Sequence, residues 1–405
     1  MATSEKTTLR RQKWKRSILE IIRSTPNASR IAVKRQSGLS MDSTLSLVEE
    51  LLCEGLILTS GKSDSGKAGR KATILEINPA GCYFIGVRFS AAGISGVLMD
   101  FSLRAAASSR KEFSALPHEE ELVSAILSCI DELINALGAN HNRLRGIGLG
   151  APGIIDLSSG CILRYAHMPS ISSLPLRRIV EEKYRVPVYL EHGVKCSARA
   201  ALSLPEYATN RDMLFMQTGR GIHMCVVIGG RIHNGMHYLS GEIGHMLIAP
   251  GQTLEEMISS DALCVHALRA IESDGLAFSI LQAQRSGRIT LDSLIRAAEN
   301  GCQDSRALLE RAGEAAGIAL CAGIMLVNPQ DIVLNGTLCA SPFFTDAVRR
   351  TLQRRCIPES LIDVRLRFIA SDPRQDATGA AMLPYSKQFS AGTDGEDTPD
   401  GAALS

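Results

Sequence analysis

The sequence predicts an α/β protein in which a small helical domain precedes a larger body of two lobes. Three observations lead to this fold class. Within the first 75 of the 405 residues, apolar side chains have helical spacing and basic residues are concentrated. Residues 82–385 alternate strand-like and helix-like stretches, which is the pattern of α/β domains. A body of about 300 residues exceeds one ordinary hydrophobic core, so we expect two lobes.

Charge is distributed unevenly along the chain. The first 75 residues hold fourteen Lys and Arg against seven Asp and Glu, whereas the remaining 330 residues have a balance of −5. A basic head on a mildly acidic body indicates that the head meets a polyanion, with nucleic acid as the first candidate and an acidic membrane surface as the second. The longest apolar stretch, 315–327, is too short to span a bilayer, and the polar N-terminus contains no secretory signal.

The basic region predicts three short helices. The first is expected around residues 14–22, where apolar side chains recur with helical spacing, and Pro26 ends it. The second is expected after Ser29 and ends at a turn in which Gly38 takes a left-handed conformation. Ser40 is a good N-cap for the third. Three short helices with a glycine turn between the second and third are typical of a helix-turn-helix.

A β-hairpin is predicted after the third helix. Apolar alternation begins at 55–57 and returns at 72–77, with a basic, glycine-rich loop between the two segments. Strand, basic loop and strand describe a wing, so residues 1–78 (the head) are predicted to form a winged helix-turn-helix. In this geometry the third helix enters the major groove and the wing neutralises phosphates or reaches the minor groove.

The residues expected to contact DNA lie on the second helix, on the first turns of the third and on the wing. They are Arg30, Lys34, Arg35, Ser40, Met41, Ser43, Ser46, Lys67, Arg70 and Lys71. The third helix exposes no Arg, Lys, Asn or Gln there, and Asp42 repels phosphate, so we expect base reading to depend on serines, wing contacts and DNA shape. The alternative is a protein-interaction or dimerisation module, but the excess positive charge favours DNA.

Four segments of the body carry a recognisable pattern. They are Gly-Ile-Gly-Leu-Gly-Ala-Pro-Gly at 146–153 followed by Asp156, Pro-Val-Tyr-Leu-Glu at 187–191, Gly-Glu-Ile-Gly-His at 241–245, and Asn-Pro-Gln-Asp-Ile-Val-Leu-Asn-Gly at 328–336. On these segments the chain from about residue 10 to 385 resembles the ROK family of sugar kinases and sugar-responsive repressors. The head, with Gly69-Arg70 in its wing, resembles that of the repressor branch. The resemblance implies a two-lobed actin-like (ribonuclease H-like) ATPase fold.

The predicted elements and boundaries follow from this division. Strands are expected at 83–87, 93–100, 146–150, 188–191, 213–218, 225–228 and 331–335, and helices at 119–137, 176–184, 194–202, 254–271, 291–300 and 305–327. The first lobe is expected to cover 79–200, completed by about 367–387, and the second 201–366. Residues 388–405, rich in Ser, Gly, Asp and Thr, are predicted to be a disordered tail.

The resemblance also allows the kinase chemistry to be tested against the sequence. Phosphoryl transfer needs loops that hold phosphates and a carboxylate that accepts the hydroxyl proton. The family kinases carry Asp-x-Gly-Gly-Thr where this chain has Arg88 and no glycine pair, and the second phosphate loop here is bulky at 219–224. The glycine run on the adenosine side is reduced to 335–337. The catalytic base falls at Gly193, so we expect no kinase activity and no cofactor; a carbohydrate kinase with a DNA-binding head is the alternative.

No metal site is predicted. In the family, a histidine like His245 and a following loop of cysteines hold a structural zinc, but here residues 246–254 between His245 and Glu255 contain no cysteine. His233 and His237 could be imagined to complete a triad with His245, yet they lie in a Gly/Asn-rich loop without a fourth partner. The eleven cysteines are all at least 17 positions apart, which favours a reduced, cytoplasmic protein.

By resemblance, a sugar binds in the cleft between the lobes. The residues expected to bind it are His192, Glu242, His245 and Glu255. Gly193 removes one strong hydroxyl acceptor. Arg88 and Arg220 suggest a second possibility, a phosphorylated or acidic ligand, because guanidinium groups suit phosphate and carboxylate.

Together these patterns predict a cytoplasmic DNA-binding transcriptional regulator of carbohydrate-related genes, which we expect to be a repressor with a non-catalytic effector and oligomerisation body. Its expected partners are a double-stranded DNA operator and a sugar or sugar-phosphate effector, with no membrane. Two heads are needed to span half-sites about 34–36 Å apart, so we expect a homodimer or tetramer. A regulator controlled by a protein partner instead of a sugar remains the other alternative.

Overall fold

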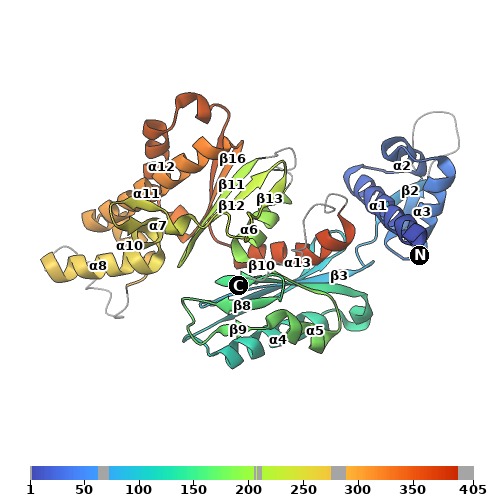
Figure 1. The fold of residues 1–405 in the computed structure, drawn as a ribbon, viewed down its shortest axis with the longest axis horizontal. Coiled ribbons are helices and arrows are strands. Elements are labelled where there is room, and N and C mark those ends of the chain that lie inside the picture. Colours follow the sequence, from blue (N-terminus) through green and yellow to red (C-terminus); the bar gives the residue numbers. More distant parts are fainter. Residues whose placement is uncertain (1, 63–72, 205–206, 208–211, 275–288, 391–405) are drawn as a thin grey trace. The chain divides into compact units, whose positions relative to one another are not determined.

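The computed structural model describes residues 2–62, 73–204, 207, 212–274 and 289–390 (Figure 1). The chain divides into two compact units, which we describe separately. The first unit is Met1–Ala200 with Pro373–Ser405, and the second is Ala201–Asp372. Both contain helices and sheets, which confirms the predicted α/β class. Among the described residues, none of the helices has the length and apolar content needed to cross a membrane.

The predicted winged helix-turn-helix lies at the start of the first unit (Figure 1). Its elements are the helices α1 (Ala2–Ser24), α2 (Arg30–Ser37) and α3 (Met41–Cys53) and the strands β1 (Ile57–Lys62) and β2 (Thr73–Ile77). The two strands pair antiparallel as a hairpin. The three helices and the two strands of the wing are thus confirmed.

Local sequence sets the ends of these helices. The Ser29 hydroxyl accepts a hydrogen bond from the backbone N–H of Ala32 and begins α2. Gly38, with φ of 72°, ends α2 in the left-handed conformation that glycine adopts without strain. The Ser40 hydroxyl accepts from the N–H of Ser43 and begins α3. The short turn between α2 and α3 is therefore encoded by two local signals, Gly38 and Ser40.

The rest of the first unit is built on a five-stranded sheet in the order β10-β6-β3-β4-β5. Its strands are β3 (Tyr83–Ser90), β4 (Gly93–Asp100), β5 (Ala105–Glu112), β6 (Leu144–Ala151) and β10 (Val188–His192). Strands β3, β4 and β5 form an antiparallel meander, and β6 and β10 extend it in parallel. Strand β5 is absent from the sequence prediction, because it is a mostly exposed, polar edge strand without apolar alternation.

Helices cover both faces of this sheet, with α13 on one side and α4 on the other (Figure 1). The helices of the first unit beyond the head are α4 (Glu119–Asn135), η1 (Gly138–Arg143), α5 (Leu176–Tyr184), α6 (Gly193–Leu202) and α13 (Pro373–Phe389). A small sheet of β7 (Ile154–Asp156), β8 (Cys161–Arg164) and β9 (Ser172–Leu174) lies beside them. The backbone of α13 approaches the sheet at Gly86 and Gly148, where an added Cβ would overlap it. The sheet and α13 are therefore in direct backbone contact.

The second unit repeats this sheet topology, with five strands in the order β13-β12-β11-β16-β17. They are β11 (Met213–Thr218), β12 (Ile222–Ile228), β13 (Arg231–His233), β16 (Asp331–Gly336) and β17 (Arg365–Ile369). Here too an antiparallel meander is extended by two parallel strands. The remaining elements are η3 (Ile243–His245), β14 (Leu247–Ala249), β15 (Gln252–Thr253), α7 (Leu254–Ile258), α8 (Ser260–Asp274), α10 (Leu291–Glu299), α11 (Gln303–Val327), η4 (Thr337–Ala340), α12 (Pro342–Arg355) and η5 (Pro358–Leu361).

Several predicted boundaries differ from the structure, among them the first helix, which was expected around 14–22 and spans Ala2–Ser24. The helix expected at 254–271 is two helices, because Ser259 has an extended backbone with ψ of 151°. Strand β17 pairs with β16, so it belongs to the second sheet, although residues from about 367 were assigned to the first lobe. Residues 388 and 389 were assigned to the tail, but they belong to α13, which continues to Phe389. Residues 391–405 lie outside the described part of the chain.

The head shares a hydrophobic cluster with the first sheet. Ile18, Val33 and Leu51 of the head are buried in the same cluster as Phe84 and Phe101 of the sheet. The cluster also contains α13 through its residue Ala381, and Tyr385 and Phe389 pack against it. Because the head buries apolar surface against the sheet and α13, it is a packed part of the first unit.

Candidate nucleic-acid interface and ligand-binding residues

The first turns of α3 present a small polar surface. Ser40, Met41, Ser43 and Ser46 are exposed, whereas Leu47 is buried with the other apolar residues of the inward stripe. The Ser40 hydroxyl is within 2.9 Å of the Ser43 hydroxyl. The residues predicted to face base edges therefore lie together on the side of α3 that faces away from the core.

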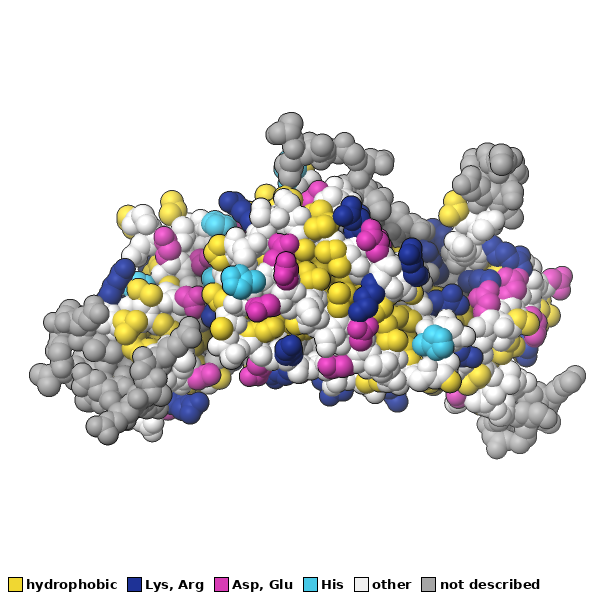
Figure 2. Space-filling view, turned by 90° about the horizontal axis from the view of Figure 1, so that it is seen from below, with side chains coloured by type: hydrophobic (Ala, Val, Ile, Leu, Met, Phe, Trp, Pro, Cys, Tyr) yellow, Lys and Arg dark blue, Asp and Glu magenta, His cyan; other side chains and the backbone are white. Residues whose placement is uncertain are grey.

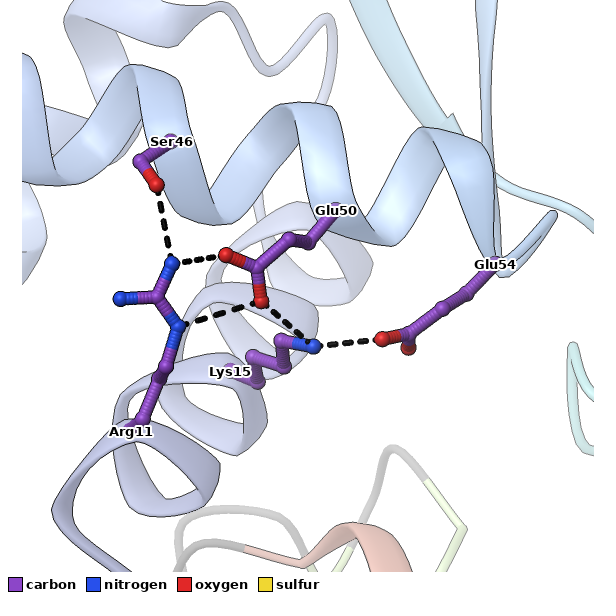
Figure 3. A network of polar contacts seen from close by, with 5 residues as sticks. All are labelled: Arg11, Lys15, Ser46, Glu50 and Glu54. Carbon is purple, nitrogen blue, oxygen red and sulfur yellow. Dashed lines mark hydrogen bonds and ion pairs between the residues drawn. The ribbon is translucent and has the colours of Figure 1, made fainter. Parts of the chain in front are cut away.

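A network of ions joins α1 to the outer side of α3 (Figure 3). The Arg11 guanidinium donates to both oxygens of the Glu50 carboxylate and, from Nη2, to the Ser46 hydroxyl at 2.9 Å. The Lys15 ammonium lies 2.8 Å from Glu50 Oε2 and 2.5 Å from Glu54 Oε1. Hydrogen bonds from Arg11 and from Lys15 lower the pKa of the Glu50 carboxyl to about 2.

This network compensates the acidic side of α3. Two carboxylates near a DNA-binding face would repel phosphate, and Arg11 and Lys15 offset their charge. Arg11 and Lys15 were not among the predicted site residues; Arg11 lies 39 positions from Glu50, and Lys15 lies 39 positions from Glu54. Their spacing of four residues on α1 places both on one face of that helix, and this is the signal that could have indicated a shared role.

The basic residues of α2 differ in whether another residue of the head pairs with their charge. Arg30 was predicted to contact DNA, but its Nη2 lies 2.5 Å from Glu49 Oε1, so its charge is paired within the head. Lys34 and Arg35 are exposed, and their side chains have no ion-pair or hydrogen-bond partner among the described residues. Lys67, Arg70 and Lys71 of the wing lie outside the described residues.

Two arginines of α1 attach the head to the sheet and α13. Arg16 donates to the main-chain oxygens of Gln388 at 3.0 Å and Lys387 at 3.2 Å, at the C-terminal end of α13. Arg23 donates from Nη2 to the carbonyl of Phe101 at 2.8 Å, and its guanidinium lies 5.3 Å from the centre of the Tyr385 ring. Cation–π contact and charge-assisted hydrogen bonds therefore reinforce the shared hydrophobic cluster.

In the first unit, His192 is the one residue predicted to bind a ligand. It ends β10 and is 9% exposed, and its backbone N–H donates to the carboxylate of the buried Glu191 at 2.8 Å. Gly193 follows and begins α6. The side chain of Arg88 on β3 lies against Gly193, where an added Cβ would overlap the guanidinium. The structure thus places Arg88 of β3 beside Gly193 and the preceding His192.

The other three predicted ligand-binding residues belong to the second unit. Glu255 on α7 accepts a hydrogen bond from the N–H of Ile222 at 3.0 Å, and Glu242 Oε2 lies 3.4 Å from His223 Nδ1. His245 is exposed at the end of η3. The Cβ position of Gly221 is 2.7 Å from His223 Nε2 and 3.5 Å from Glu255 Oε2, so His223 lies near both glutamates. His223 was not singled out, although it stands in the loop at 219–224.

The residues around His245 do not fit a zinc site. His245 is exposed, and the loop before Glu255 contains no cysteine. Among the described residues, no three or more His, Cys, Asp or Glu side chains lie together in a group that could hold a metal ion. All eleven cysteines are free, and burial raises the pKa of the Cys82, Cys339 and Cys356 thiols to about 12.

A surface groove of about 750 Å³ on the first unit contains none of the residues predicted to bind a ligand. It runs along α4, where acidic side chains such as Glu120 and Asp131 surround apolar ones such as Val123 and Leu127. Figure 2 shows a face of the molecule on which side chains of both charges lie among hydrophobic ones. No single sign of charge covers that face.

Comparison with known proteins agrees with this architecture. Over 393 residues the chain is 22% identical to the xylose repressor of Caldicellulosiruptor bescii, covering 95% of this chain and 98% of that one. It is 26% identical to the DNA-binding transcriptional repressor Mlc of Escherichia coli over 80% of this chain and 81% of Mlc. A ROK family transcriptional regulator described as a homologue of E. coli Mlc has a similar crystal structure, with a TM-score of 0.79 and 19% identity, covering 94% of this chain and 97% of that one.

The fold and the family agree with the sequence prediction. The similarity to the solved regulator covers the head as well as both units, which confirms the fold class of a winged helix-turn-helix followed by a two-lobed actin-like body. The sequence profile described as "ROK family" matches residues 84–386, which is most of the chain beyond the head. This chain therefore belongs to the ROK family.

Proposed function

We propose that the protein is a cytoplasmic DNA-binding transcriptional regulator, specifically a repressor, of carbohydrate-related genes. The observation that carries this proposal is the exposed polar start of α3, held against α1 by ion pairs that offset its acidic side. The names of the relatives, a xylose repressor and a DNA-binding repressor, support the same function.

The head is proposed to bind a double-stranded operator. The exposed serines and Met41 of α3 face the bases, and Lys34 and Arg35 of α2 contact phosphates. The wing residues Arg70 and Lys71, with Lys67, are proposed to bind phosphates or the minor groove. Two copies place two heads on two half-sites, so the operator complex is a dimer or a tetramer. Selection of bound genomic fragments by the purified protein tests this directly.

The body is proposed to lack kinase activity. Gly193 has no side chain that accepts a proton, and the space beside it holds the Arg88 guanidinium. A cation there does not replace a general base, because the attacking hydroxyl must lose its proton to an acceptor. The competing function, a carbohydrate kinase with a DNA-binding head, requires ATP consumption that depends on a sugar.

An effector is proposed to act on the head through α6 and α13. His192 precedes α6, and on α6 the Ser197 hydroxyl donates to the carboxylate of Asp376 on α13 at 2.5 Å. The other end of α13 accepts the hydrogen bonds from Arg16, and its Tyr385 ring packs against Phe84 of β3. These contacts lie within the first unit and lead from His192 to α1. By linkage, an effector that weakens operator binding must itself bind the operator complex more weakly by the same factor.

A further inference from the structure

Arg88 lies at an edge of the first sheet that is suited to ligand binding. It pairs in register with Gly150 of β6, which in turn pairs with Glu191 of β10. These three residues stand near the carboxyl ends of three parallel strands, next to His192 and Gly193. In open α/β sheets, ligands bind outside the carboxyl ends of such strands.

The Arg88 guanidinium makes a hydrogen bond through one of its nitrogens and none through the other two among the described residues. Nη1 donates to the carbonyl oxygen of Phe89. Nε is buried without a hydrogen-bond partner, and Nη2 also has none among the described residues. Leaving a buried N–H unpaired costs free energy, which an acceptor at this edge would recover. Nε and Nη2 together form the edge of an arginine that binds two oxygens of one group.

Gly193 is what makes room for this guanidinium. A Cβ at position 193 would overlap Cζ, Nε and Nη2 of Arg88, so any side chain there is incompatible with the observed position of Arg88. The absence of a side chain also leaves the first turn of α6 open, where backbone N–H groups and the helix dipole favour negative charge. The observed position of the Arg88 guanidinium therefore depends on glycine at position 193.

The charged groups on neighbouring elements do not pair with this edge of Arg88. Lys195, 2% exposed, and Arg199 lie on α6, the helix that begins at Gly193. Asp376 already accepts a hydrogen bond from Ser197, and the Glu191 carboxylate accepts one from the backbone. No hydrogen bond or ion pair joins Glu191 to Arg88 among the described residues. The Nε–Nη2 edge thus has no internal anion.

We propose that this edge binds an anionic group of the effector, with Arg88 donating two hydrogen bonds from Nε and Nη2 to a carboxylate or phosphate. The proposal rests on the proposed function, since it names the chemistry of the ligand that regulates the head. The two donors of this edge match the paired oxygens of a carboxylate or phosphate, and charge strengthens both hydrogen bonds, whereas a single neutral hydroxyl uses only one of them. The proposed effector is therefore an acidic sugar derivative, either a sugar acid or a sugar phosphate.

The test measures ligand binding to the purified full-length protein by isothermal titration calorimetry. The probes are glucose, glucuronate, glucose 6-phosphate and inorganic phosphate. We expect an anionic probe to bind at least about tenfold more tightly than glucose. Glucuronate and glucose 6-phosphate distinguish a carboxylate from a phosphate. Tighter binding of glucose, or no binding of any anionic probe, overturns the proposal.

Three variants locate the binding. Arg88→Gln and Gly193→Ala should each weaken anion binding at least about tenfold, the first by removing the donors and the second by displacing the guanidinium. Arg178→Gln, on the exposed surface of α5, is the control and should bind like the wild type. Anion binding that survives in both Arg88→Gln and Gly193→Ala overturns the proposal. Operator binding without ligand is measured in parallel for the wild type and Arg178→Gln, which should bind equally, so failure of the wild type to bind DNA counts against the proposed function alone.

Discussion

The Ser197 hydroxyl and the Asp376 carboxylate form a buried hydrogen bond between α6 and α13, with 2.5 Å between Oγ and Oδ1. Asp376 is only 6% exposed, and its helix enters the first unit at Pro373. The bond therefore fixes the start of α13 against the helix that follows His192. The bond thus joins the helix that follows His192 to a helix whose other end accepts hydrogen bonds from α1.

Removing the hydroxyl tests this connection. Ser197→Ala leaves the buried Asp376 carboxylate with one hydrogen bond fewer, so we expect a loss of about 1–3 kcal/mol in the free energy of unfolding. The measurement is urea unfolding followed by circular dichroism. Ser128→Ala, an exposed residue of α4, is the matched control and should change stability little. Equal stability of the two variants would mean that the bond does not hold α13.

The attachment of the head by Arg23 gives a second prediction. Arg23→Ala removes the hydrogen bond to the Phe101 carbonyl and the contact with the Tyr385 ring. We expect a loss of about 1–3 kcal/mol, seen in urea unfolding by the fluorescence of Trp14, the only tryptophan of the chain. Arg178→Ala on α5 should leave the unfolding curve unchanged. A curve for Arg23→Ala that matches the wild type would show that the apolar cluster alone holds the head.

The ion network between α1 and α3 predicts a pH dependence. Hydrogen bonds from Arg11 and Lys15 lower the pKa of Glu50 from 4.5 to about 2 in the folded protein. The ionised carboxylate therefore stabilises the head above pH 4.5, and this contribution is lost as the pH falls from 4.5 toward about 2. The residues are partly exposed, so the contribution should stay below about 1 kcal/mol.

Substitution of Glu50 by Gln measures this contribution. The variant should be less stable than the wild type at neutral pH, and the difference should shrink as the pH falls below 4.5. Thermal unfolding followed by Trp14 fluorescence is the readout. Glu120→Gln, an exposed residue of α4, should leave the pH dependence as it is. A difference that stays constant across this pH range would contradict the ion network.

The absence of a base at position 193 predicts that the protein does not phosphorylate sugars. Incubation with ATP and a panel of hexoses, pentoses and amino sugars should release no more ADP than a control without protein. The physical reason is that Gly193 has no proton acceptor and Arg88 fills the adjoining space. Sugar-dependent release of ADP that disappears in Glu242→Gln would refute this prediction.

Much of the head could be predicted from sequence because its signals are local. Ser29, Gly38 and Ser40 mark the ends of the helices within a few residues, and each cap is observed as expected. The buried strands of both sheets were predicted for the same reason, since continuous apolar runs bounded by turns indicate them. By contrast, β5 is polar and exposed at a sheet edge, and nothing in its pattern distinguishes it from a loop.

The contacts that position the candidate site residues join segments far apart in the sequence, so the periodicity of the sequence does not predict them. Arg11 meets Glu50 only because α1 and α3 pack together, and Arg88 meets Gly193 only because β3 and β10 flank β6. The pairing of Arg30 with Glu49 is another long-range contact that its residue type and position did not indicate, and its predicted DNA contact stays a prediction. His192 lies in the first unit, and Glu242, His245 and Glu255 lie in the second. That these four residues bind one ligand together stays a prediction.

The most direct test of the account is the salt dependence of DNA binding by the head. The purified protein is bound to a genomic fragment that it selects, and the association constant is measured by fluorescence anisotropy over a range of salt concentrations. The double variant Lys34→Ala, Arg35→Ala should bind more weakly and reduce the slope of log K against log salt by about 2. Lys183→Ala on α5 should change neither the affinity nor the slope. Selective binding with this reduced slope is the predicted result, whereas failure to select any fragment, or an unchanged slope in the double variant, would contradict it.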